Sequence, residues 1–219
     1  MPRSVYSVEM EIAGDTAMWT RVDTGDAPVT LPVLTFSAAK AIFESILLGQ
    51  NTTVVPTMIE ICAPLRYHSY HTNYGGPLRQ TKSIAGGNSY QLLATVLIDV
   101  CYRLYADIVP NKKRECLSER SLQWDKKTTS PGHAYQDIFN RRLSRGQCYS
   151  IPFLGWKEFA PSYFGPFRET TRVQTDLTVK IPSMLRQVFS KGYNSEVSVV
   201  YDRDVVIDHG ILLFSGKES

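Results

Sequence analysis

No stretch of this 219-residue chain approaches the roughly 18 consecutive apolar residues that a transmembrane helix needs. The sequence has no P-loop, no G-x-G-x-x-G, no H-E-x-x-H and no Asp/Glu cluster suited to a two-metal nuclease. Its four cysteines, Cys62, Cys101, Cys116 and Cys148, contain no C-x-x-C pair, which argues against a zinc site or a disulfide framework. We therefore expect a cytoplasmic protein with no membrane span, no bound metal and no cofactor.

The net charge is small, at +3, but the charged residues are unevenly distributed along the chain. Residues 1–60 have three Lys/Arg against seven Asp/Glu, residues 61–145 have thirteen against six, and residues 146–219 have eight of each. The central segment, with a net charge of +7, is expected to attract a polyanion such as nucleic acid. A solvated basic loop is the alternative, because residues 111–129 hold much of this charge.

Hydrophobic periodicity predicts the order of the elements. The clearest strand is Ile98–Ile108, where apolar residues alternate with polar ones. The clearest helix follows Ser130, an N-cap residue, with Pro131 at its first position and Gly146 as a left-handed stop. The predicted elements are a strand over 5–12, a helix from Ser37 to Gly49, strands over 58–63 and 98–108, a helix over 131–145 and a strand over 148–153.

This order predicts an α+β fold of the ferredoxin-like βαββαβ type, with four antiparallel strands backed by two helices. Residues 1–160 would form that domain, and residues 161–219 a small antiparallel β appendage. In the first strand, Val8, Met10 and Ile12 would face the core while Glu9 and Glu11 face solvent. Residues 66–89 are expected to be a mobile loop or a hairpin, and residues 111–129 a long loop.

Several segments of the chain resemble the Cas-five proteins of type I-C CRISPR systems, subtype d, of the RAMP superfamily. The matching segments are GDTAMWTR (14–21), LTFSAAKAIFESI (34–46), ICAPLRYHS (61–69), DVCYRLYADI (99–108), HAYQDIFNRRLSRGQC (133–148) and PFLGWKEFAPSY (152–163). The resemblance implies a metal-independent endoribonuclease that cleaves pre-crRNA in the repeat and retains the 5′ handle. Its implied partners are CRISPR repeat RNA and the other type I-C Cascade subunits, with no membrane contact.

The resemblance also implies a catalytic set, namely a tyrosine just after the first helix and a Lys-His pair at the start of the second. His133 matches the histidine, whereas Gly132 and Leu47 stand where the lysine and the tyrosine would be. Lys126 and Lys127 are the candidates to supply the cation, and Tyr67, Tyr70 or Tyr135 to supply the phenol. Histidine suits proton transfer at neutral pH, but His133 can equally bind phosphate or cap its helix without catalysis.

The expected RNA-binding residues are aromatic or basic, since single-stranded RNA stacks on aromatic and guanidinium planes and pairs with cations at phosphate. They are Trp19, Arg21, Arg66, Tyr67, His68, Tyr70, His71, Arg79, Lys82, Arg141, Arg142 and Arg145. An aromatic surface loop is the alternative for the run after Arg66, and capping of the helix dipole for the three later arginines.

Two functional hypotheses follow. The first is an endoribonuclease that processes the guide RNA and keeps its 5′ handle. The second is a catalytically inactive scaffold subunit that only caps the handle, which Leu47 and Gly132 favour. An unrelated ferredoxin-like RNA binder is a third, less specific hypothesis.

Overall fold

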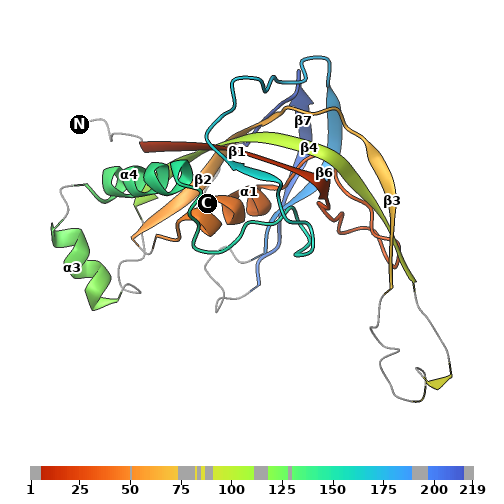
Figure 1. Cartoon of the computed structure of the whole chain (residues 1–219), viewed down its shortest axis with the longest axis horizontal. Helices are drawn as coiled ribbons and strands as arrows, with labels where there is room; N and C mark the ends of the chain where they lie inside the picture. Colours follow the sequence, from red (N-terminus) through yellow and green to blue (C-terminus); the bar gives the residue numbers. More distant parts are fainter. Residues whose placement is uncertain are drawn as a thin grey trace.

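The computed structural model describes residues 6–49, 51–73, 82, 85–86, 91–110, 118–127, 130–188 and 197–214. The fold is mixed α/β and is built on one antiparallel sheet of eight strands (Figure 1). The strands are β1 (Tyr6–Ala17), β2 (Thr52–Ile61), β3 (Tyr67–Asn73), β4 (Gln91–Pro110), β5 (Tyr163–Gly165), β6 (Val179–Gln187), β7 (Val200–Asp208) and β8 (Ile211–Leu213), and the helices are α1 (Phe36–Ile46), α3 (Glu119–Lys127) and α4 (Pro131–Ser144). Their order across the sheet is β5-β1-β4-β2-β8-β7-β6, and β3 also pairs with β4.

Strand β4 is the central strand of the sheet and has different partners in its two halves. Its C-terminal part lies between β1 and β2, whereas residues 91–97 pair with β3. The change occurs at a distortion around Asp99, whose φ is 54°. Beside it, Ile98 donates to the Arg66 carbonyl and Cys62 to the Cys101 carbonyl. The predicted alternation over 98–108 is confirmed, but the strand is longer. Of the two structures expected over 66–89, the antiparallel pairing of β3 with β4 agrees with the hairpin.

The core lies between one face of the sheet and the two helices α1 and α4. Val8, Met10 and Ile12 are buried there, as their alternation predicts. The rings of Phe43 from α1 and Phe139 from α4 lie 5.8 Å apart, so both helices pack on the same face. Each such buried side chain contributes about 2 kcal/mol relative to exposure.

The N-cap of helix α1 lies two residues before the predicted cap at Ser37. Thr35 is the N-cap, and its hydroxyl accepts a hydrogen bond from the Ala38 N–H. Phe36, the first helical residue, is buried against Phe214 in an edge-to-face contact, which fixes where the helix starts. The helix ends at Ile46, before the predicted stop at Gly49.

The other face of the sheet contains a buried ionic cluster around Glu11, which the alternation of β1 had placed in solvent. Glu11 is 0% exposed because residues 163–172 fold over it. Its carboxylate accepts hydrogen bonds from the Arg168 backbone at 3.0 Å, from the Arg168 Nε at 2.5 Å and from the Thr171 hydroxyl at 2.9 Å. Burial alone would raise the pKa of Glu11, but these donors outweigh it and the pKa is lowered.

The strand predicted over 148–153 is wrong, since that segment is irregular. It runs back along α1, where the Tyr149 N–H donates to the Ser45 carbonyl. It then turns at Gly155, whose φ is 94° and where a Cβ would meet the Met18 carbonyl oxygen at 1.8 Å. The strand that pairs with the free edge of β1 is β5, further along the chain.

The C-terminal strands extend the same sheet. Strand β8 pairs with β2, with Leu213 opposite Met58, and β7 and β6 follow beyond it. Within the described ranges, no helix is long and apolar enough to cross a membrane.

Candidate nucleic-acid interface

The first turn of α4 presents His133 to solvent. Ser130 caps the helix, with its hydroxyl 3.5 Å from the His133 N–H, and Pro131 occupies the first turn as predicted. The His133 side chain is 60% exposed, and its Nδ1 lies 3.1 Å from the Asp137 carboxylate one turn later. A carboxylate at Nδ1 favours the tautomer protonated there, which leaves Nε2 as the proton acceptor.

Tyr6, at the start of β1, is the neighbour of His133 that sequence reasoning missed. The two rings lie 5.9 Å apart at an interplanar angle of 83°. The Ser130 hydroxyl donates to the Tyr6 hydroxyl at 2.8 Å, so one serine joins the helix cap to this ring. Because 124 residues separate the two partners in the sequence, no local pattern predicts the contact.

The position of Tyr6 also explains why residue 132 is a glycine. A Cβ at this position would lie 2.5 Å from Tyr6 Cδ2, so the tyrosine ring fills the space that any larger residue, including a lysine, would need. The tyrosine at position 6 therefore requires a glycine at position 132 for the two to pack together.

Tyr135 lies close to Leu47, the position at which the resembled family has tyrosine. Its hydroxyl donates to the Leu47 carbonyl, and its ring packs where a Cβ on Gly49 would be. The side chain is 4% exposed, and burial raises the pKa of its hydroxyl. Residues 133 and 135 are about 200° apart around the helix, so Tyr135 faces away from His133. Tyr135 is thus a structural residue and does not replace the missing phenol.

The two candidate lysines belong to α3, which corrects the loop expected over 111–129. Ser118 caps this short helix by accepting from the Ser121 N–H, and the Asn51 amide anchors it by donating to the Ser121 carbonyl. Lys127 is exposed at the C-terminal end of α3, three residues before the Ser130 cap. The side chain of Lys126 lies outside the described part of the chain.

An exposed stripe runs along α4 from His133 towards the helix C-terminus. His133, Asp137, Arg141 and Arg145 are spaced four residues apart, and all four are exposed. Arg141 and Arg145 lie about 12 and 18 Å from His133 along the helix axis. Arg142 is on another face and donates to the Ile46 carbonyl at 3.1 Å, which caps α1. The expectation of RNA contact therefore fits Arg141 and Arg145 better than Arg142.

The aromatic-basic run after Arg66 forms the β3–β4 arm and not a loop. Tyr67, His68 and His71 are exposed on it, whereas Tyr70 packs edge-to-face on Phe159 with ring centroids 5.3 Å apart. Arg66 forms an ion pair with Asp99 at 3.2 Å, at the distortion of β4. Lys82 is exposed, and Arg79 lies outside the described residues.

Trp19 is a core residue, which corrects its place among the expected RNA contacts. It is 3% exposed, and its Nε1 donates to the Tyr102 hydroxyl at 3.2 Å. Arg21, two residues further on, is exposed but is paired with Asp23 at 2.6 Å.

Strand β3 of the arm and helix α4, which begins beside His133, lie on opposite sides of the molecule (Figure 1). Tyr6, beside His133, pairs with Ile108 of β4, whereas Tyr67 pairs with Leu97. Eleven residues of strand separate these positions, or about 35 Å. The two sequence-predicted clusters are therefore separate surfaces, and an RNA that touched both would have to cross the whole sheet.

No group of three or more His, Cys, Asp and Glu side chains within the described ranges is arranged to hold a metal ion. The polar groups around His133 are an imidazole, a carboxylate and hydroxyls. This set is suited to proton transfer and phosphate contact.

Comparison with known proteins is consistent across sequence and structure. A family model described as CRISPR-associated protein (Cas_Cas5), Cas5d, matches residues 7–211. The "CRISPR pre-crRNA endoribonuclease Cas5d" of Mannheimia succiniciproducens is 25% identical over 93% of this chain and 86% of its own length. The protein of the same name from Thermus thermophilus is 26% identical over 73% of this chain and 63% of its own length.

Among solved structures, one described as "Crystal Structure of CRISPR-associated Protein" superposes with a TM-score of 0.69. It covers 96% of this chain and 92% of that chain, at 17% identity. At this identity the likeness concerns the fold alone.

Proposed function

The chain belongs to the Cas5d family of CRISPR-associated proteins, and we propose that it cleaves precursor CRISPR RNA within the repeat and retains the 5′ handle. Two relatives that share its family are named pre-crRNA endoribonucleases. The observation that carries the proposal is the exposed His133 imidazole, held by Asp137 and Tyr6 at the open start of a helix.

The proposed reaction needs no metal. His133 Nε2 takes the proton of the ribose 2′-hydroxyl, whose oxygen attacks the adjacent phosphorus and expels the 5′-oxygen of the next nucleotide. Asp137 holds the imidazole through Nδ1 and stabilises the imidazolium that forms, and the imidazolium then returns the proton to the leaving oxygen. The reaction yields a 2′,3′-cyclic phosphate and a 5′-hydroxyl, so atoms and charge balance.

The reaction also needs positive groups that stabilise the negative charge on the phosphorane. The N-terminus of α4 offers backbone N–H groups and the positive end of the helix dipole. We assign the nearby cation to Lys127 or Lys126 of α3, in place of the lysine that Gly132 excludes. Arg141 and Arg145 would hold the RNA backbone along the α4 stripe, and Arg66, Tyr67, His68 and His71 a second portion of RNA on the β3–β4 arm.

We also propose that six elements form the ferredoxin-like βαββαβ unit, namely β1, α1, β2, β4, α4 and β5. Because β5 is its fourth strand, that unit extends past residue 160 to Gly165, and the later strands continue its sheet. The proposed partners are the repeat RNA, the crRNA 5′ handle and the other subunits of a type I-C Cascade complex.

Cleavage of the cognate repeat RNA in excess EDTA tests the proposal. The wild-type protein is expected to cut, and His133→Ala to cut about 10²–10⁴ times more slowly, the usual contribution of one general base. His209→Ala is the matched control, because His209 is also an exposed histidine paired with an aspartate, Asp208 at 2.8 Å. Equal rates for the wild type and His133→Ala would refute the catalytic role.

The alternative function is a scaffold that caps the 5′ handle without cutting. Leu47 and Gly132 favour it, because two of the three positions implied by the family resemblance differ. A wild-type protein that binds the repeat RNA tightly but leaves it intact would establish this alternative.

A further inference from the structure

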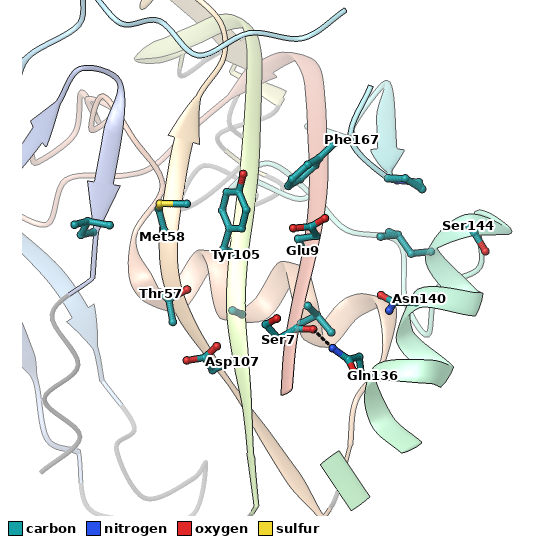
Figure 2. Close-up of a pocket in the computed structure, with 15 residues that line it drawn as sticks. Ser7, Glu9, Thr57, Met58, Tyr105, Asp107, Gln136, Asn140, Ser144 and Phe167 are labelled. Carbon is teal, nitrogen blue, oxygen red and sulfur yellow. Dashed lines mark hydrogen bonds between the residues drawn. The ribbon is translucent and has the colours of Figure 1, made fainter. Parts of the chain in front are cut away.

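A groove of about 850 Å³ crosses the sheet face that is turned away from α1 (Figure 2). Its floor consists of two rows of side chains across the strands. In the first row Leu213, Met58, Tyr105 and Glu9 are successive partners on β8, β2, β4 and β1. In the second, Asp107 pairs with Ser7. Gln136, Asn140 and Ser144 of α4 form one wall, and Phe167 closes the end next to the Glu11 cluster.

The chemistry of this groove is acidic and apolar, unlike the surface around His133. Glu9 and Asp107 line it together with Met58, Phe167 and Leu213, and its lining includes no Lys, Arg or His. Neither carboxylate forms an ion pair with another described residue, and Leu213 is 69% exposed. Burial raises the pKa of Asp107, as expected for a carboxylate without a cation.

Two arginines beside the Phe167 end of the groove, Arg103 and Arg168, are already paired. Arg103 lies over the Phe167 ring at 4.8 Å and is 3.6 Å from both Glu11 and Glu60. Arg168 is hydrogen-bonded to Glu11. A polyanion such as RNA is therefore repelled from this face, whereas a cationic ligand would be attracted.

The spacing of the two acids fits an extended chain. Glu9 is opposite Tyr105, and Asp107 lies one row further along β4, so the two acids are diagonal neighbours about 7–8 Å apart. Side chains two residues apart on an extended polypeptide are separated by about 7 Å and point the same way. The Gln136 amide nitrogen donates to the Ser7 carbonyl at 2.5 Å (Figure 2), and the Asn140 amide lies along the same wall, where it can bond to the main chain of such a segment.

We propose that this groove binds an extended, basic segment of a partner protein, with Lys or Arg at alternate positions facing Glu9 and Asp107. The aliphatic stems of these Lys or Arg side chains would cover the apolar part of the floor at Met58 and Tyr105. The inference does not depend on RNA cleavage, because none of the residues proposed for cleavage lines the groove.

A fluorescent ten-residue peptide of alternating lysine and valine is the probe, and binding is measured by anisotropy with the full-length protein. The wild type is expected to bind it and to lose affinity as salt rises. Glu9→Gln/Asp107→Asn, which preserves side-chain size, is expected to bind at least tenfold more weakly at an unchanged melting temperature. Asp26→Asn removes an exposed carboxylate elsewhere and is expected to bind as the wild type does.

A further probe makes the test specific. An otherwise identical peptide with its lysines in adjacent pairs is expected to bind more weakly, because its cations do not share one side. No binding by the wild type, equal binding by the double variant, or equal binding of the two peptides would each overturn the proposal.

Discussion

The substitution Gly132→Ala tests the pairing of Gly132 with Tyr6 by thermal unfolding. In an ordinary helix the change would stabilise the protein by about 1 kcal/mol, because glycine is the poorer helix former. Here the new Cβ would lie 2.5 Å from Tyr6 Cδ2 and 3.0 Å from Cε2. Since ordinary carbon contacts are about 3.5–4.0 Å, the ring must shift by about 1 Å.

That shift disturbs two contacts of Tyr6. The ring pair with His133 is worth about 0.5–1.5 kcal/mol, and the hydrogen bond with Ser130 about the same. With the helix gain of about 1 kcal/mol subtracted, we expect a net loss of stability of up to about 2 kcal/mol. For a chain of this size the melting temperature would fall by up to about 8 °C.

The same change in a Tyr6→Ala background provides the control. With the ring absent, Gly132→Ala should raise the melting temperature by about 2–4 °C, since only the helix preference remains. The difference between the two backgrounds measures the coupling of the two residues. A stabilising Gly132→Ala in the wild-type background would refute the account of why glycine stands at this position.

Three further predictions concern stability and RNA affinity. Glu11→Gln should lower the free energy of unfolding by about 2–4 kcal/mol at pH 7, because it removes the buried carboxylate that pairs with Arg103 and Arg168. The pKa of Glu11 is lower in the folded than in the unfolded state, so its contribution to stability is complete above the unfolded-state pKa and is lost as the pH falls through the folded-state pKa. The difference in melting temperature between wild type and variant should therefore shrink at low pH, and a difference that does not change with pH would contradict this. Arg66→Gln should lower the salt slope of repeat-RNA binding by about 1, whereas Trp19→Phe should leave it unchanged. Arg141→Gln should weaken RNA binding in filter-retention assays, and Arg142→Gln should instead lower the melting temperature by disrupting the cap of α1.

Local pattern predicted the elements that carry their own signals. Helix α4 begins at the predicted cap, Ser130, and Gly146 has the predicted left-handed conformation with a φ of 63°. The alternation of β4 likewise identified its buried face. In these cases each residue's preference and its tertiary environment agree.

Glu11 and Tyr6 could not be predicted in the same way. Glu11 is buried by Arg168 and Thr171, roughly 160 residues later in the chain, and nothing within β1 signals that cover. Tyr6 acquires its role only when β1 brings it beside the cap of α4. Both depend on contacts between residues far apart in the sequence, and hydrophobic periodicity within one segment carries no information about such contacts.

The errors at α3 and Trp19 have a different origin. Helix α3 is polar almost throughout, so it lacks an apolar stripe, and its cap at Ser118 was the available but unused signal. Trp19 follows a strand that was expected to end at residue 12, but β1 continues to Ala17 and leads the indole into the core. Knowledge of the strand's true length would have placed Trp19 inside the protein.

The chemistry of the cleaved end tests the central proposal most directly. Repeat RNA is cut by the wild-type protein in EDTA, and the 3′ terminus of the upstream fragment is identified by mass spectrometry, beside an RNA with a 2′-deoxy sugar at the scissile nucleotide. Attack by the 2′-hydroxyl, assisted by His133, predicts a 2′,3′-cyclic phosphate and no cleavage of the deoxy substrate. A 3′-hydroxyl terminus, or cleavage of the deoxy substrate, would contradict it.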